Sequence, residues 1–194
     1  PKLAPIQVVI IPIPKPSEAI DNIAQKMLSE LKSKGIKVIY DRDEKNRPGF
    51  KFAEYELKGG PVRIGIGARD IENGVVEIAR RDTKEKVSIS IDQAVDHTMQ
   101  VIDDIQKNLF QRAKELRERT THIVDTWDEF VKILDEKPGF IYAHWDGTKE
   151  TEKLIKEKTK ATIRCIPLDA PEENGKCILT GNPSMKRVLF AKAY

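Results

Sequence analysis

The residues whose types and spacing could do chemistry gather in one segment, residues 41–70. Carboxylates, arginines, lysines and aromatic residues lie there among glycines and prolines, in the order DRDEKNRPGFKFAEYELKGGPVRIGIGARD. Arginine forks, lysines and carboxylates at the edge of a sheet can hydrogen-bond the polar edges of unstacked bases. The same residues could equally form a solvated surface with ordinary ion pairs, such as Glu54–Lys58 at i,i+4. Spacing alone leaves both interpretations open.

Signatures of the common enzyme classes are missing from the sequence. It contains no GxxxxGK[ST] phosphate loop, no G-x-S-x-G nucleophile elbow and no H-E-x-x-H metal-binding helix. Gly65 and Gly67 form a G-x-G, but the third glycine of a dinucleotide-binding loop is absent. The three histidines lie far apart in the sequence, and a surface or core role suits each better than catalysis: His97, His122 and His144. These observations favour a binding protein over an enzyme that acts on its own.

Composition excludes several classes of protein. The chain has 194 residues, of which 39% are hydrophobic and 34% charged, so it is neither disordered nor of low complexity. No apolar run approaches the roughly 18–20 residues of a membrane helix, and we expect neither a secretory leader nor a membrane partner. The net charge of +3 neither indicates nor excludes nucleic-acid binding. Two cysteines, Cys165 and Cys177, are too few for a disulfide framework, which favours a reducing, cytoplasmic setting. Because the chain starts at Pro1 and enters a strand at once, we expect a fragment of a longer protein.

Strands and helices of the first half must position the charged segment. Apolar runs over residues 6–13 and 36–40 flank a helix that begins after the N-cap Ser17 and ends at Gly35, which predicts a βαβ unit with parallel strands. Further on we expect a helix over residues 50–57 and strands over residues 62–66 and 75–79, with a hairpin turn at Asn73-Gly74. A long helix follows over residues 92–119, with these apolar residues on one face: Val95, Met99, Ile102, Leu109 and Leu116.

A second α/β series begins near residue 120. Its pattern predicts helices over residues 128–134 and 149–158, and strands over residues 140–143, 162–166, 177–179 and 187–191. We place a domain boundary within residues 111–120, giving one domain over residues 1–112 and another over residues 113–194.

Motifs in both halves resemble one family. The stretches LAPIQVV (residues 3–9), residues 41–70 as quoted above and RRDT (residues 80–83) closely resemble the anticodon-binding domain of prolyl-tRNA synthetases. ATIRCIP (residues 161–167), GKC (residues 175–177) and the ending VLFAKAY (residues 188–194) resemble the extra C-terminal domain of the archaeal/eukaryotic-type branch. The resemblance implies an α/β fold: an anticodon-binding domain with a mixed, mainly parallel sheet flanked by helices, then a small α+β domain.

The resemblance also implies a function. Members of the family are class II enzymes that activate proline with ATP and Mg²⁺, ligate it to tRNA(Pro), and act as cytoplasmic homodimers. Their catalytic motifs are absent here, so we expect this chain to recognise the anticodon of tRNA(Pro) and to be inactive alone. The alternative is a stand-alone tRNA-binding or synthetase-scaffold module without catalysis. A small enzyme in its own right lacks any nucleophile–base pair that the sequence shows.

In the family, charged residues of the anticodon-binding domain read the two guanines shared by proline anticodons. Carried over to matching positions, the candidate contacts are Glu56, Arg63, Arg69, Asp70 and Lys86. A carboxylate can accept hydrogen bonds from guanine N1–H and N2–H₂, and an arginine can donate to O6 and N7.

Members of this branch often hold a zinc ion in the C-terminal domain with four cysteines. The resemblance places those four ligand positions at Asp146, Thr151, Cys177 and Thr180. A structural zinc site requires four ligands, mostly thiolate or imidazole, so we expect no zinc in this chain.

Overall fold

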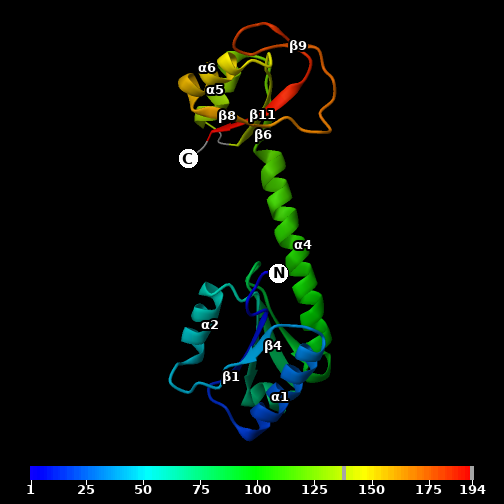
Figure 1. Ribbon diagram of the computed structural model, residues 1–194. Coiled ribbons are helices and arrows are strands. Elements are labelled where there is room, and N and C mark those ends of the chain that lie inside the picture. The colour runs from blue at the N-terminus through cyan, green and yellow to red at the C-terminus, as the bar shows by residue number, and fades with distance from the viewer. Residues whose placement is uncertain (137–138, 193–194) are drawn as a thin grey trace. The chain divides into compact units, whose positions relative to one another are not determined.

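A computed structural model describes residues 1–136 and 139–192 of the chain. They form two compact units, Pro1–Gln111 and Arg112–Tyr194, each with a hydrophobic core of its own (Figure 1). Within the described residues no helix is both long and apolar enough to cross a membrane. Ala193 and Tyr194, the end of the C-terminal motif, lie outside the described residues.

The first unit is built on a mixed five-stranded sheet with the strand order β2-β1-β3-β4-β5. Its strands are β1 (Val8–Ile13), β2 (Val38–Tyr40), β3 (Val62–Gly67), β4 (Val75–Arg80) and β5 (Lys86–Ser90). Strand β1 pairs in parallel with both β2 and β3, whereas β4 is antiparallel to β3 and β5. The mixed sheet flanked by helices is the fold class that the resemblance implies, but it is not mainly parallel, because two of its pairings are parallel and two are antiparallel.

The βαβ unit forms as the sequence predicts. Helix α1 (Glu18–Ser33) begins after Ser17, whose hydroxyl accepts a hydrogen bond from the Ile20 backbone N–H at 3.4 Å. Gly35 follows the end of α1 with φ +80°, the left-handed conformation that glycine adopts without a steric penalty. The buried face of α1 then packs on the sheet through Ile20, Ala24, Met27 and Leu31.

Helices cover the two faces of this sheet differently. The remaining helical segments of the first unit are α2 (Pro48–Leu57), α3 (Ala68–Glu72), η1 (Ile91–Gln93) and α4 (Ala94–Arg119). Figure 1 shows α2 on one side of the sheet and α1 and α4 on the other. The main core lies between the sheet and α1 and α4, where Ile10, Ile64 and Ile78 are buried. Helix α2 therefore lies over the opposite sheet face.

Three details of the first unit differ from the sequence-based expectation. Asn73-Gly74 does not form a two-residue hairpin turn, because α3 occupies most of the connection between β3 and β4 and Asn73 caps it. Strand β5 was not predicted, and it pairs with β4 along its whole length. On α4, Val95 and Ile102 are buried as expected, but Leu109 and Leu116 are exposed.

The second unit is a smaller α+β assembly. Its four-stranded sheet has the order β6-β7-β11-β8, made of β6 (Thr121–Ile123), β7 (Phe140–His144), β8 (Ala161–Cys165) and β11 (Arg187–Lys192). Helices α5 (Trp127–Glu136) and α6 (Lys149–Thr159) complete it, and β9 (Gly175–Lys176) pairs with β10 (Pro183–Ser184). Its core includes Phe130 and Phe190, whose rings meet edge to face with centroids 5.2 Å apart.

The prediction of a strand over residues 177–179 is wrong. The Cys177 N–H donates to the Asn182 carbonyl at 2.8 Å, and the Gly181 N–H donates back to the Cys177 carbonyl at 2.9 Å. These bonds close a turn between β9 and β10. Strand β6, which was not predicted, is only three residues long.

Candidate functional site

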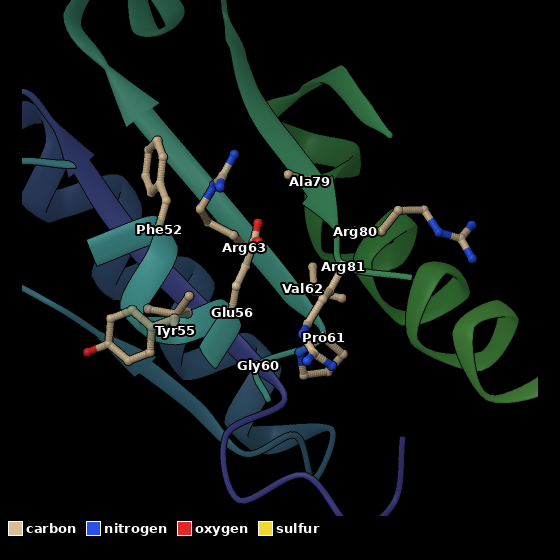
Figure 2. A pocket seen from close by; sticks show the side chains of 11 residues that line it. Phe52, Tyr55, Glu56, Gly60, Pro61, Val62, Arg63, Ala79, Arg80 and Arg81 are labelled. Atoms are coloured by element: carbon tan, nitrogen blue, oxygen red, sulfur yellow. The ribbon is translucent and has the colours of Figure 1, made fainter. Parts of the chain in front are cut away.

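A polar strip crosses the sheet face beneath α2. Arg63 of β3, Ala79 of β4 and Lys86 of β5 are direct neighbours in register, so their side chains share one face. Glu77 belongs to the same face, because it is two residues from Ala79 along β4. Helix α2 supplies Phe52 and Glu56, which line a pocket together with Arg63 (Figure 2). The charged segment of the sequence thus meets β4 and β5 at this face.

Arg63 lies at the centre of this pocket. The residue is 8% exposed, its Nη2 lies 3.2 Å from Glu77 Oε1, and its guanidinium carbon lies 3.7 Å from the centre of the Phe52 ring. Its Nε is buried and has no hydrogen-bond partner among the described residues. An unpaired buried donor costs about 1–3 kcal/mol, so this N–H favours any rearrangement of the Arg63 side chain that gives it an acceptor.

Glu56 is more accessible than Arg63. Its side chain is 42% exposed, and its Oε2 accepts a hydrogen bond from Lys84 Nζ at 2.8 Å. That hydrogen bond holds the pKa of the Glu56 carboxyl below its usual range, and the charge of Arg63 acts in the same direction. Glu56 is therefore ionised at neutral pH and can only accept hydrogen bonds.

Lys86 extends the strip at the edge strand. Its side chain is 57% exposed and its Nζ lies 4.0 Å from Glu77 Oε1. Glu77 thus lies between two of the predicted contact residues, Arg63 and Lys86. The carboxylate compensates part of the positive charge of this face and fixes the orientation of the buried arginine.

Arg69 and Asp70 lie apart from the other three predicted residues, on α3 at the C-terminal end of β3. Asp70 Oδ2 accepts a hydrogen bond from the Gly67 N–H at 2.8 Å and so caps α3, while Arg69 is exposed. In the described part of the chain, no hydrogen bond or ion pair joins either residue to Glu56, Arg63 or Lys86. The structure therefore brings three of the five predicted residues to one face and places two at its end.

Sequence reasoning did not find Phe52, Glu77 or Lys84. Phe52 was within reach of it, because it precedes Glu56 by four residues on a predicted helix and so lies beside it. Glu77 and Lys84 meet Arg63 and Glu56 only through the pairing of β3, β4 and the turn before β5. The sequence alone does not give that register.

Together these groups can do recognition chemistry. An ionised carboxylate, a guanidinium and an aromatic ring converge on one pocket from α2 and β3. Figure 2 shows Phe52 and Glu56 directed toward Arg63, whereas Arg80 points to the other side of the sheet. Such a set suits a planar ligand that carries both donors and acceptors on its edge.

The four positions that the resemblance assigns to zinc are close together in the second unit, but they do not fit the metal. Asp146 Oδ2 accepts hydrogen bonds from Thr151 Oγ1 at 2.9 Å and from Thr180 Oγ1 at 2.8 Å. Cys177 is buried in the turn that contains Thr180. One carboxylate and one thiol are too few for a closed tetrahedral site. The described residues contain no group of three or more His, Cys, Asp and Glu residues that could hold a metal ion.

Comparisons with known proteins agree with this architecture. Residues 7–100 match the family described as anticodon binding domain, and residues 127–194 match that described as prolyl-tRNA synthetase, C-terminal. The whole chain is 56% identical to the proline–tRNA ligase of Cytophaga hutchinsonii and 53% identical to those of Porphyromonas gingivalis and Flavobacterium johnsoniae. In each case it spans 40% of the length of the relative. The chain therefore belongs to the prolyl-tRNA synthetase family and corresponds to its C-terminal part, an anticodon-binding domain followed by the family's C-terminal domain.

Proposed function

We propose that the first unit binds the anticodon of tRNA(Pro) and reads its guanines. The observation that carries this proposal is the convergence of Glu56, Arg63 and Phe52 on one pocket of an anticodon-binding domain. Guanine donates from N1–H and N2–H₂, which matches the Glu56 carboxylate, and accepts at O6 and N7, which matches the Arg63 fork. An unstacked base can also lie against an aromatic or guanidinium plane, and the Phe52–Arg63 pair offers both.

The other predicted residues lie outside this pocket on the same unit. Lys86 is exposed at the edge strand and suits a contact with a phosphate of the anticodon loop. Arg69 and Asp70 lie at the end of β3, where a neighbouring nucleotide of the loop would pass. We assign them to this second position because Asp70 still has one carboxylate oxygen free of the α3 cap.

We infer that the chain acts as part of a cytoplasmic, homodimeric proline–tRNA ligase. The names of the relatives support the ligase, since each is a proline–tRNA ligase, whereas the cytoplasmic homodimer is what the family resemblance implies. Ligation with ATP and Mg²⁺ is assigned to the part of those relatives that the chain does not match, and no catalytic residue is assigned here. Anticodon binding by this chain would then select the tRNA on which that reaction takes place.

Synthetic anticodon stem-loops test the proposal on the full chain. Affinity is measured by fluorescence anisotropy at one fixed salt concentration, first for the proline anticodon and then with each guanine replaced by inosine or by 7-deazaguanine. Inosine lacks the 2-amino group and 7-deazaguanine lacks N7, so each substitution removes one expected contact. We expect a loss of about 1–3 kcal/mol for a substitution that removes a specific contact.

A stem-loop substituted outside the anticodon is the matched control and should bind as the parent does. Glu56→Gln should bind the inosine and guanine loops more equally, since the carboxylate is the expected partner of the 2-amino group. Equal affinity of the unaltered chain for all of these loops would refute guanine reading by this unit.

A further inference from the structure

Helix α2 is held against the sheet in an unusual way. All ten of its residues are described, and Lys51 is the one that is buried. Of its large apolar residues, Phe50 and Leu57 are 57% and 88% exposed, and Phe52 is half-buried beside Arg63. Amphipathic helices normally dock through an apolar face. The position of α2 therefore depends heavily on what holds Lys51.

The Lys51 ammonium group is bound to Asp41, the first residue after β2. Lys51 Nζ donates to Asp41 Oδ1 at 3.0 Å and to the Asp41 carbonyl at 3.1 Å, and the lysine side chain is 3% exposed. The Tyr55 hydroxyl donates to the second carboxylate oxygen at 3.2 Å. Burial, followed by the charge of Asp41, raises the pKa of Tyr55 to about 12, so the phenol stays a donor at neutral pH.

Asp41 is itself fixed to the sheet. Its backbone N–H donates to the Ile10 carbonyl of β1 at 3.0 Å, and its Oδ1 accepts from the Asp43 N–H at 2.9 Å. We call Asp41, Lys51 and Tyr55 the Asp41 cluster. It joins α2 to the end of β2 and to β1.

The helix uses two neighbouring faces for two tasks. Lys51 and Tyr55 are four residues apart and share one face, while Phe52 and Glu56 share the next. Figure 2 shows the Tyr55 hydroxyl pointing away from Arg63, whereas Phe52 and Glu56 point toward it. One face therefore anchors the helix and the adjacent face presents its side chains to the pocket.

We propose that Lys51, through the Asp41 cluster, is a positioning residue for anticodon reading, an inference that rests on the function proposed above. A buried ion pair adds little net stability compared with apolar packing, but it demands one geometry. That geometry sets the rotation of α2 about its axis and its position along the sheet. It thereby fixes where the Glu56 carboxylate and the Phe52 ring meet a base held by Arg63.

Removing both charges of the pair tests the proposal without leaving an unpaired charge in the interior. The variant is Asp41→Asn/Lys51→Met in the full chain. Lys58→Met is the matched control, because Lys58 caps the C-terminal end of α2 and is also ion-paired, to Glu54 at 2.6 Å, but its side chain is 54% exposed. Its Nζ lies 5.5 Å from the centre of the Tyr55 ring, so the control removes that weak contact and leaves the hydrogen bonds of the Asp41 cluster in place. The readout is the ratio of affinities for the guanine and inosine stem-loops, with far-UV circular dichroism to verify folding.

We expect the double variant to fold and to lose roughly tenfold in the guanine-to-inosine ratio, because a misplaced Glu56 forfeits one specific base contact. The control should keep the ratio of the parent. Tyr55→Phe retains the ion pair and should lose about threefold, with faster hydrogen exchange at the amides of α2, so the proposal stays testable if the double variant does not fold.

Two results would overturn the positioning role. One is a guanine-to-inosine affinity ratio equal to that of the unaltered chain, measured in a folded double variant or, if that variant does not fold, in Tyr55→Phe. The other is a loss of this ratio in Lys58→Met as large as the loss in the double variant. Failure of the underlying function looks different, because the unaltered chain would then already bind the guanine and inosine loops equally.

Discussion

At the scale of single residues, the contacts of Arg63 require a planar guanidinium. Stacking on Phe52 and the bond to Glu77 both use that plane, which a lysine ammonium cannot reproduce. We predict that Arg63→Lys weakens binding of the proline anticodon stem-loop by about 1–3 kcal/mol, although charge is conserved. Arg42→Lys is the control, since Arg42 is 60% exposed and pairs with Asp21. Unchanged affinity of Arg63→Lys would remove Arg63 from the base contacts.

Lys86 should behave differently from Arg63. It is exposed and lies on the edge strand, so we expect contact with a phosphate and not with a base. Lys86→Ala should then weaken all stem-loops by a similar factor, and the slope of log affinity against log salt should fall by about 1. Titrations at several salt concentrations measure both quantities. A loss confined to one anticodon sequence would instead make Lys86 a base-reading residue.

Asp82 makes the first unit sensitive to acid. Arg80 donates to it twice, at 2.8 and 2.7 Å, and these bonds lower the pKa of Asp82 to about 2. Because the carboxyl pKa is lower in the folded state, its stabilisation is complete above about pH 4 and is lost as the pH falls toward 2. With a side chain only 3% exposed, the expected loss is about 2 kcal/mol of unfolding free energy.

Urea unfolding followed by circular dichroism between about pH 5 and about pH 2 measures that loss. Asp82→Asn should flatten the pH dependence, whereas Asp96→Asn, at a position with a 78% exposed side chain, should leave it unchanged. If Asp82→Asn retains the full acid sensitivity, another carboxyl is responsible.

The candidate site was predictable from the sequence only in part. Glu56 and Arg63 lie in the motif, Lys86 follows from the family resemblance beyond it, and the structure brings Glu56 of α2 over the sheet face that carries Arg63 and Lys86. What holds them there does not follow from it. Glu77 reaches Arg63 through the pairing of β3 with β4, and Asp41 reaches Lys51 through the docking of α2. Both depend on register and packing between segments far apart in the sequence.

At the scale of elements, long amphipathic or apolar segments were predictable and short ones were not. The βαβ unit has caps, apolar periodicity and short connections that all agree. Strands β5 and β6 are short and contain polar residues, so they are recognisable only beside their partner strands. Conversely, residues 177–179 are apolar enough for a strand, but the bond from the Cys177 N–H to Asn182 closes them into a turn, and the Ile178 N–H reaches the His144 carbonyl of β7 without forming a strand.

The turn after β9 gives a prediction about metal. Asp146 accepts hydrogen bonds from Thr151, Thr180 and Asn182. Although burial acts to raise it, the hydroxyls of Thr180 and Thr151 hold the pKa of Asp146 below its usual range. We expect this hydrogen-bonded cluster to hold β9, β10 and α6 together without zinc. A chelator should then leave the thermal unfolding of the second unit unchanged, while Asp146→Ala should cost about 2–3 kcal/mol.

A cysteine graft provides the converse test of the same cluster. Replacing Asp146, Thr151 and Thr180 by cysteine, with Cys177 already present, supplies the four thiolates that structural zinc prefers. The triple variant should bind about one zinc per chain after dialysis, and the parent none. Zinc bound by the parent in elemental analysis would contradict the metal-free interpretation.

At the scale of the whole molecule, the two units have separate hydrophobic cores and differ in their content of tryptophan, the fluorescent probe of unfolding. The clusters built around Ile64 and around Phe130 share no residue. Both tryptophans, Trp127 and Trp145, are in the second unit, so tryptophan fluorescence follows that unit alone. Circular dichroism reports helices and strands of both. We therefore predict that denaturant curves recorded with the two probes do not coincide, because the chain unfolds in two steps.

Variants already described assign the two steps. Asp146→Ala should shift the fluorescence transition to lower denaturant and leave the other step in place, because its contacts lie within the second unit. At acid pH, Asp82→Asn should change only the step that fluorescence does not detect, since Arg80 and Asn108 hold Asp82 within the first unit. Coincident curves that both variants shift together would show instead that the units unfold as one. Anticodon RNA binds the first unit in our proposal, so it should raise the midpoint of that step alone.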